Sequence, residues 1–239
     1  MAQDIPLLTT LIFLVLCIVV FYFFLKMLIK PFNGHESKKN KFITSISISI
    51  WLAIQALLSQ NGFYLDSYEM PPRALIAVGP PMLTIFILLY VLWRSEYVKK
   101  LSLNALTQIH VFRFPLEFFV LTGLASSGYI PDVMTYEGRN YDIVVGLTAP
   151  IIGYLYFYKK SISWKILLTW HIISLGFLLF ITTHALLSLP YSFQVFGMDQ
   201  PNIGVFYFPF IWLPTLLVGV GYFCHIFAIH KLMIWRDKA

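Results

Sequence analysis

The distribution of basic residues between long apolar runs constrains this chain more than any other feature. A transmembrane α-helix needs about 20 consecutive apolar residues, and the chain contains seven runs that come close to this length. The runs cover Leu7–Leu28, Phe42–Leu58, Ala74–Trp93, Ala105–Leu124, Ile143–Tyr158, Ile166–Leu187 and Val205–Leu232. Because the runs are continuous and do not alternate apolar with polar residues, they predict helices and not a transmembrane barrel.

The composition supports the same interpretation. Of the 239 residues, 59% are hydrophobic and 12% are charged, whereas soluble domains carry roughly 25% charged residues. A water-soluble fold of this size would expose much of that apolar surface. We therefore expect an all-α polytopic membrane bundle of about seven transmembrane helices, forming one transmembrane domain over residues 1–239 with no separate soluble domain.

The basic residues predict the orientation of the bundle. Fourteen of the 17 lie in one set of gaps and ends, namely Lys26, Lys30, Lys38, Lys39, Lys41, Arg94, Lys99, Lys100, Lys159, Lys160, Lys165, Lys231, Arg236 and Lys238. The opposite set holds only Arg73 and Arg139. Because cytoplasmic loops are enriched in Lys and Arg, the N-terminus is expected outside and the C-terminus in the cytoplasm. The net charge of +6 is thus a topology signal, which indicates a lipid bilayer as partner and no nucleic acid.

Two charged residues fall inside the fourth run. Arg113 and Glu117 are four residues apart, so their side chains can meet on one face of a helix, and Pro115 between them predicts a kink. A charge at the centre of a bilayer costs about 2.5–3.5 kcal/mol on insertion scales. The sequence leaves two interpretations open: a ligand or proton site centred on this pair, or a structural ion pair that fixes helix packing.

A second polar cluster precedes the fifth run on the outer side. Glu137, Arg139, Asn140 and Asp142 lie within six residues of one another, and Asp199 occupies the next outer gap. Arg139 departs from the orientation bias, which predicts a specific partner such as Glu137, Asp199 or an external anion. The cluster is either an ordered cap or the mouth of an outward-facing ligand site.

Three histidines share one predicted depth. His110, His171 and His225 each lie about six or seven residues from the cytoplasmic edge of a run, roughly 10 Å at 1.5 Å per residue. Three imidazoles at one level can ligate a metal ion or a haem iron, or form hydrogen bonds between helices. Equal depth does not show that the three side chains converge. The two cysteines, Cys17 and Cys224, lie inside runs and are expected to be small buried residues.

Two outer segments carry a resemblance to a family. Met134–Ile143, continuing into Gly146–Pro150, and Asp199–Asn202, continuing into Tyr207–Pro214, resemble a family of uncharacterised bacterial inner-membrane proteins. The resemblance covers most of the chain from the fourth run onward. It implies a multi-pass protein of the bacterial inner (cytoplasmic) membrane, and it implies no activity or catalytic residue.

Three functions remain open on the sequence alone. The missing catalytic motifs favour a non-enzymatic accessory, assembly or sensor module. The first alternative is a small transporter or ligand receptor with its polar site at Arg113 and Glu117, and the second is a haem- or metal-dependent membrane enzyme that uses the three histidines. The sequence identifies no cofactor, and it leaves the partner open between another membrane protein and a small-molecule ligand.

Overall fold

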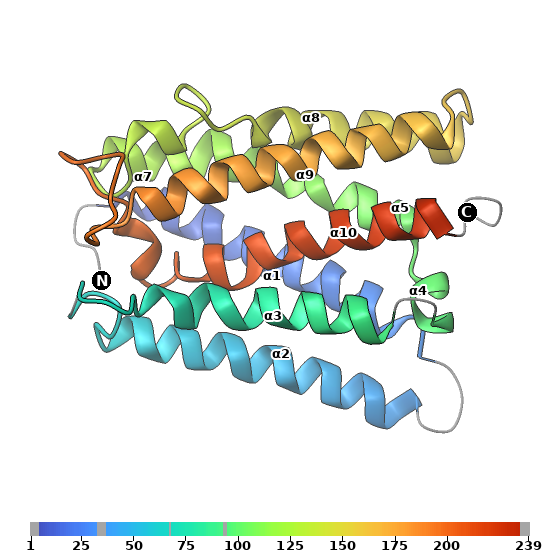
Figure 1. The fold of residues 1–239 in the computed structure, drawn as a ribbon, viewed down its shortest axis with the longest axis horizontal. Helices are drawn as coiled ribbons and strands as arrows, with labels where there is room; N and C mark the ends of the chain where they lie inside the picture. The colour runs from blue at the N-terminus through green and yellow to red at the C-terminus, as the bar shows by residue number, and fades with distance from the viewer. Residues whose placement is uncertain (1–4, 33–36, 67, 93–94, 235–239) are drawn as a thin grey trace.

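The computed structural model describes residues 5–32, 37–66, 68–92 and 95–234, and all the regular structure in these ranges is helical (Figure 1). Within them, six helices are long and apolar enough to cross a membrane, which is compatible with the predicted multi-span membrane protein. They are Leu7–Ile29, Ser37–Gln60, Ala74–Val91, Leu103–Ser126, Trp164–Leu187 and Leu213–Ile234. A seventh apolar helix, Asp142–Tyr158, is shorter. Trp93, Arg94, Arg236 and Lys238 lie outside the described residues.

Four of these helices are uninterrupted: α1 (Leu7–Ile29), α2 (Ser37–Gln60), α3 (Ala74–Val91) and α9 (Trp164–Leu187). In Figure 1 they run along the long axis, with α2 and α3 at the bottom, α9 near the top and α1 in between. The second helix begins at Ser37 and not at Phe42. The five polar residues from Ser37 to Lys41 include no glycine or proline, so they can continue the helix. A short helix, α4 (Glu96–Lys100), follows α3.

The remaining crossings lose their regularity beside proline residues, whereas α3 stays helical through Pro80 and Pro81. The fourth consists of α5 (Leu103–Gln108), the 3₁₀ turn η1 (Ile109–Phe112), α6 (Arg113–Pro115), the π-helix η2 (Leu116–Leu121) and α7 (Thr122–Ser126). Pro115 donates no backbone hydrogen bond and its ring crowds the preceding turn, which explains why the α-helical ladder changes on both sides of it. The kink predicted from the sequence therefore takes the form of a 3₁₀ turn followed by a π-helix.

The same effect recurs in two later helices. The helix α8 (Asp142–Gly153) contains Pro150 and continues as the π-helix η4 (Tyr154–Tyr158). The last crossing begins with the π-helix η6 (Leu213–Leu217), which contains Pro214, and continues as α10 (Val218–Ile234). The predicted start of this crossing at Val205 is wrong, because the 3₁₀ turn η5 (Gly204–Phe206) and a further turn precede the helix.

The loops that join α7 to α8 and α9 to η6 pack together at one end of the bundle. The first contains the 3₁₀ turn η3 (Asp132–Met134). Gly204 N donates to Tyr129 O at 2.7 Å, and Gln200 Nε2 donates to Ala125 O at 2.8 Å. These contacts join the two loops into one ordered cap.

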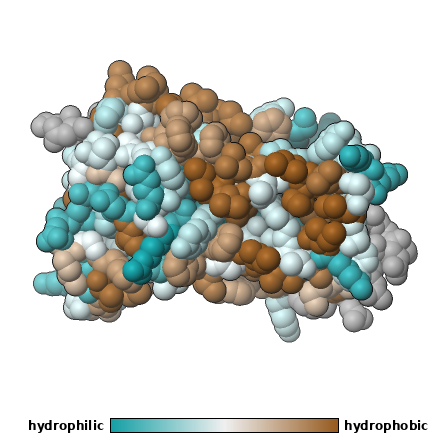
Figure 2. Space-filling model, turned by 90° about the horizontal axis from the view of Figure 1, so that it is seen from above, coloured by the Kyte–Doolittle hydropathy of each residue, from teal (hydrophilic) through white to brown (hydrophobic). Residues whose placement is uncertain are grey.

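The core lies around α10, which packs against α3, α4, α5 and α9. α9 contributes a stripe of buried residues at every third or fourth position, which is the spacing of one helix face: Leu167, His171, Ser174, Leu178, Ile181 and His184. Large apolar side chains such as Leu8, Leu57 and Phe86 remain exposed on the outside of the bundle. Figure 2 shows hydrophobic residues over the middle of one face and hydrophilic residues toward the two ends, the distribution expected of a surface that contacts lipid.

Candidate functional site

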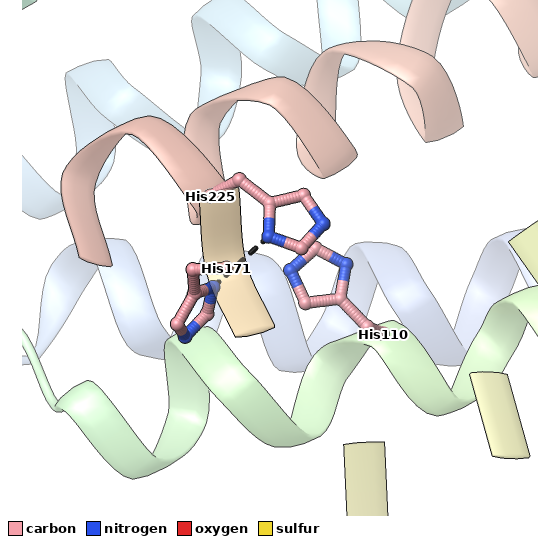
Figure 3. Close-up of side chains that lie close together, drawn as sticks. All are labelled: His110, His171 and His225. Carbon is pink, nitrogen blue, oxygen red and sulfur yellow. Dashed lines mark hydrogen bonds between the residues drawn. The ribbon is translucent and has the colours of Figure 1, made fainter. Parts of the chain in front are cut away.

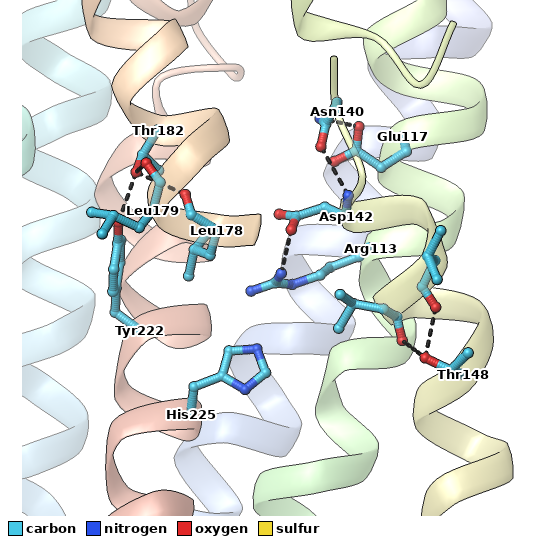
Figure 4. A network of polar contacts seen from close by, with 12 residues as sticks. Arg113, Glu117, Asn140, Asp142, Thr148, Leu178, Leu179, Thr182, Tyr222 and His225 are labelled. Carbon is cyan, nitrogen blue, oxygen red and sulfur yellow. Dashed lines mark hydrogen bonds and ion pairs between the residues drawn. The ribbon is translucent and has the colours of Figure 1, made fainter. Parts of the chain in front are cut away.

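A buried ion pair joins the fourth crossing to α8. Arg113 Nη1 lies 2.7 Å from Asp142 Oδ1, and the two side chains are only 2% and 6% exposed (Figure 4). Gly146, one turn after Asp142, allows this contact, because a methyl group at that position would meet the backbone of Phe114. The close approach of α6 and α8 therefore depends on a residue without a side chain.

The predicted pairing of Arg113 with Glu117 is wrong. Asn140 Nδ2 donates instead to Glu117 Oε2 and, at 3.1 Å, to Met134 O, while Asn140 Oδ1 accepts from Asp142 N at 3.1 Å. The loop before α8 returns into the bundle at Asn140, where Asn140 is the partner of the Glu117 carboxylate, while the Asp142 carboxylate pairs with Arg113 (Figure 4). These partners replace the contact that four-residue spacing along one helix would give.

Three of the seven residues predicted to bind a ligand stay at the surface. Glu137 and Asp199 are exposed, and Glu137 accepts a hydrogen bond from the Tyr136 hydroxyl at 3.2 Å. Arg139 is also exposed; its Nη1 lies 3.5 Å from His184 Nε2, and its guanidinium lies 5.4 Å from the ring centroid of Phe196. The structure thus brings together Arg113, Glu117, Asn140 and Asp142 and leaves the exposed three apart from them.

A cavity of about 260 Å³ opens beside the four buried residues. Its wall is mainly apolar and comes from α3, η2, α9, η6 and α10. Two buried polar atoms on lining residues have no hydrogen-bond partner, and they are the donor Arg113 Nη2 and the acceptor Asn202 Oδ1. Thr182 and Tyr222 also line the cavity, and their hydroxyl groups lie 2.6 Å apart. Sequence reasoning missed Thr182 and Tyr222, because uncharged polar residues in apolar runs carry no distinctive spacing, and it missed Asn202, because a single amide in a loop between runs carries none either.

A second cavity, of about 660 Å³, lies between α1, α2, α3 and α10 and is lined mainly by apolar side chains. It contains none of the residues predicted to form a site. The two cysteines, Cys17 and Cys224, are free and buried, so the expectation of buried thiols is confirmed.

The three histidines converge. One nitrogen from each of His110, His171 and His225 lies within 4.8 Å of the others, and all three side chains are fully buried (Figure 3). His171 Nδ1 lies 2.9 Å from His225 Nδ1, and the rings of His110 and His225 stack with centroids 3.7 Å apart. Equal depth in the sequence therefore corresponds to contact across three helices. Thr107, which sequence reasoning also missed, lies 3.1 Å from His171 Nε2 through its hydroxyl oxygen.

The fold and the buried polar centre together are compatible with a multi-span helical membrane protein that holds charged and ligand-forming side chains in its interior. No protein-family model, curated protein or solved structure matches the chain. Its function must therefore be argued from the contacts of its own residues.

Proposed function

We propose that this protein binds a small molecule in the cavity beside Arg113 and acts as a membrane receptor or transporter. The observation that carries the proposal is the pair of unpartnered buried atoms on lining residues, Arg113 Nη2 and Asn202 Oδ1. Buried donors and acceptors in proteins are nearly always paired, and an exception calls for an explanation. An apolar cavity with a few convergent polar groups is the usual form of a small-molecule site.

The charges around the cavity disfavour an anionic ligand. Among the described residues that line it, the one basic side chain is Arg113 and the two acidic ones are Glu117 and Asp142. Because Asp142 already neutralises Arg113, an added carboxylate would bring uncompensated negative charge into a buried site, which is costly. We infer a largely apolar molecule with an acceptor such as an amide or ketone oxygen for Arg113 and a donor for Asn202.

Movement of the cavity wall would allow such a ligand to enter. The wall includes parts of the π-helices η2 and η6, and π-helical turns are frequent at functional sites. Interrupted helices near the bilayer midplane also form the binding sites of many transporters. These features support the transporter form of the proposal as much as the receptor form.

The proposal includes seven spans, with the N-terminus outside and the C-terminus in the cytoplasm. The helix Asp142–Tyr158 has 17 residues, which corresponds to about 26 Å at 1.5 Å per residue, close to the roughly 30 Å hydrocarbon core. The start of α1 and the end of α10 lie at opposite ends of the bundle in Figure 1, as an odd number of crossings requires. Reporter fusions after Ser127 and after Lys160 would place the first outside and the second in the cytoplasm; two reporters on one side would contradict this topology.

The membrane and the family are also proposals. The resemblance of Met134–Ile143 and Asp199–Asn202 to uncharacterised bacterial inner-membrane proteins supports the bacterial inner membrane as the location. An accessory role in a larger complex stays a prediction, because it rests on missing motifs. The cavity gives the receptor or transporter hypothesis a specific structural basis.

Three probes of one shape would test the charge preference. 2-Naphthamide, 2-naphthoate and 2-naphthylmethylamine share a ring system and differ in charge, and their effect on thermal stability can be measured on the purified full chain in mild detergent. We expect the neutral amide to raise the Tm most, because it carries both an acceptor and a donor. A larger shift with the carboxylate or with the amine, or no shift with any of the three, would overturn the proposal.

A matched pair of variants would locate the binding site. Ala77 lines the cavity, and Ala77→Leu places an isobutyl group into it. Gly79 lies two residues along the same helix, and a side chain there would meet open space. We expect Ala77→Leu to abolish the naphthamide shift and Gly79→Leu to preserve it. Equal shifts in both variants would place the probe elsewhere.

A further inference from the structure

The histidine cluster formed by His110, His171 and His225 is independent of the cavity and is not explained by hydrogen bonding. Both ring nitrogens of His110 and the Nε2 atom of His225 are buried without a hydrogen-bond partner. A neutral imidazole always has one unprotonated nitrogen with a lone pair. The cluster therefore keeps at least one metal-binding atom of His110 unused inside the protein.

The surrounding hydrogen bonds determine which nitrogen of His225 is unprotonated. Thr107 Oγ1 donates to Leu103 O at 2.9 Å, so its oxygen accepts from His171 Nε2 at 3.1 Å. His171 Nδ1 is then the acceptor of the 2.9 Å contact, and His225 Nδ1 is the donor. This leaves the lone pair of His225 on Nε2, the atom without a partner. Thr107 is the outer partner of the cluster, because its bond to His171 Nε2 leaves the His171 lone pair on Nδ1, and outer hydrogen bonds of this kind are typical of metal-binding histidines.

The dimensions of the cluster exclude a haem and allow a single ion. The stacked rings of His110 and His225 are 3.7 Å apart, which leaves no room for a macrocycle between them. Neither of the two cavities is lined by these histidines. The three nitrogens lie within 4.8 Å of one another, so they can surround one ion once the ring of His110 or His225 tilts out of the stack and directs its in-plane lone pair at that ion.

The charge of the surroundings favours a monovalent ion. The three ligands are neutral, and Arg113 lies close by, because its Nη2 packs beside Gly221, one turn before His225. The desolvation cost of a buried ion rises steeply with its charge, and a divalent ion would have no carboxylate ligand here to offset it. Imidazole binds zinc, copper, iron and nickel, and among these copper is the metal with a stable monovalent form.

We infer that His110, His171 and His225 form a copper(I) site inside the membrane domain. His225 Nε2 and one nitrogen of His110 are available as ligands without the loss of any hydrogen bond described above. His171 completes the site through Nδ1 when His225 Nδ1 turns away from it. The site is separate from the proposed ligand cavity, and neither proposal depends on the other.

Anaerobic titration of the metal-free full chain with copper(I), against a chromogenic copper(I) chelator, tests the inference. We expect the protein to bind one equivalent, and a 100-fold excess of zinc(II) to leave it in place. His225→Asn should lower the affinity at least about 100-fold, since even the loss of a supporting residue costs 10–100-fold. His184→Asn, a control at a histidine on α9 near the outer end, should bind as the wild type does.

A second measurement keeps the inference falsifiable if the His225 variant does not fold. X-ray absorption of the copper-loaded wild type should show imidazole nitrogen ligands and the scattering pattern of their rings. A sulfur ligand would assign the copper to Cys17, Cys224 or a methionine and would overturn the inference. Failure of the wild type to bind copper(I), equal affinity of the His225 variant, or displacement by zinc(II) would overturn it as well.

Discussion

Helices α2 and α10 show two different ways to use an apolar sequence. Each belongs to a crossing long and apolar enough for a membrane, yet α2 buries three residues and α10 buries eleven. The buried side of α10 includes His225, His230 and Lys231, whereas the outer side of α2 presents apolar residues such as Ile50 and Leu57. In this bundle the buried charged and histidine side chains therefore lie on helices that other helices surround, and α2, which buries only Leu52, Gln55 and Ser59, serves as a wall.

A few specific contacts hold α2 in place. Trp51 Nε1 donates to Thr215 O at 3.2 Å, and Trp212 Nε1 donates to Leu52 O at 3.1 Å. Ser59 Oγ donates to Phe206 O at 2.6 Å. Two of these bonds run from α2 to the carbonyls of Thr215 in η6 and Phe206 in η5, and in the third the carbonyl of Leu52 on α2 accepts from Trp212. Helix α2 is thus held against η5 and η6 by three hydrogen bonds.

The largest expected effect comes from breaking the buried ion pair. Arg113→Ala or Asp142→Ala leaves one charge buried without a partner and should cost about 3–5 kcal/mol of unfolding free energy. The double variant Arg113→Met/Asp142→Leu should cost less than either single change. Thermal unfolding in mild detergent measures all three. Asp66→Ala is the matched control, because its pair with Arg73 is partly exposed at 3.7 Å and should contribute no more than about 1 kcal/mol. Additive losses in the double variant would show that the pair is not coupled.

One substitution on each helix tests the comparison directly. Leu232 in α10 is fully buried, and Leu57 in α2 is 58% exposed. We expect Leu232→Ala to cost about 2–5 kcal/mol through the cavity it leaves. Leu57→Ala should stay within about 0.5 kcal/mol of the wild type, because lipid or detergent tails replace the lost contacts. Similar losses in the two unfolding curves would mean that another surface covers α2.

Two glycines offer a finer test of packing. Gly146→Ala forces a methyl group against the backbone of Phe114 and should cost about 1–3 kcal/mol, since backbone must move to accommodate it. Gly79→Ala on α3 meets open space and should be neutral or stabilising by up to about 1 kcal/mol through helix propensity. Equal melting temperatures of the two variants would argue against close packing of α6 on α8.

The smallest expected effect concerns Tyr97, which joins the short helix α4 to α1. Its hydroxyl donates to Leu28 O at 2.8 Å, and burial raises the pKa of Tyr97 to about 12 from an ordinary value of 10.0. Because the folded protein holds this proton more tightly than the unfolded chain, the associated stability is present below pH 10 and is lost as the pH rises through about 12. Tyr97→Phe should cost about 1 kcal/mol at neutral pH and should flatten the decline of Tm between pH 10 and 12. A decline as steep as that of the wild type would assign it to other groups.

The sequence predicted the helical membrane architecture better than it predicted the partners of the buried charges. Inside a bilayer, the backbone N–H and C=O groups must form hydrogen bonds within the same segment, which an α-helix does. The length and composition of the apolar runs therefore predicted most helix ends to within a few residues. The start of the last crossing was not among them, because a 3₁₀ turn and a further turn precede the helix, which begins at Leu213 with Pro214 in its first turn. A hydropathy profile does not detect turns that are built from apolar residues.

The sequence predicted many of the residues of the site but only part of their contacts. Counting residues placed the three histidines at one depth, but their convergence depends on helix rotation, which a π-helix or a proline alters. The pairing of Arg113 with Asp142 depends on the return of the loop at Asn140, 23 residues after Glu117. Tertiary contacts of this kind leave no periodic trace in the chain.

The distance in sequence between Arg113 and its partner also affects the order of assembly. Asp142 follows Arg113 by 29 residues, so the segment that carries the arginine leaves the ribosome before its counter-charge exists. The crossing Leu103–Ser126 is the least hydropathic of the six. We therefore expect this crossing to insert stably into lipid only after α8 has been synthesised. Truncation of the nascent chain before Asp142 should leave the segment poorly integrated.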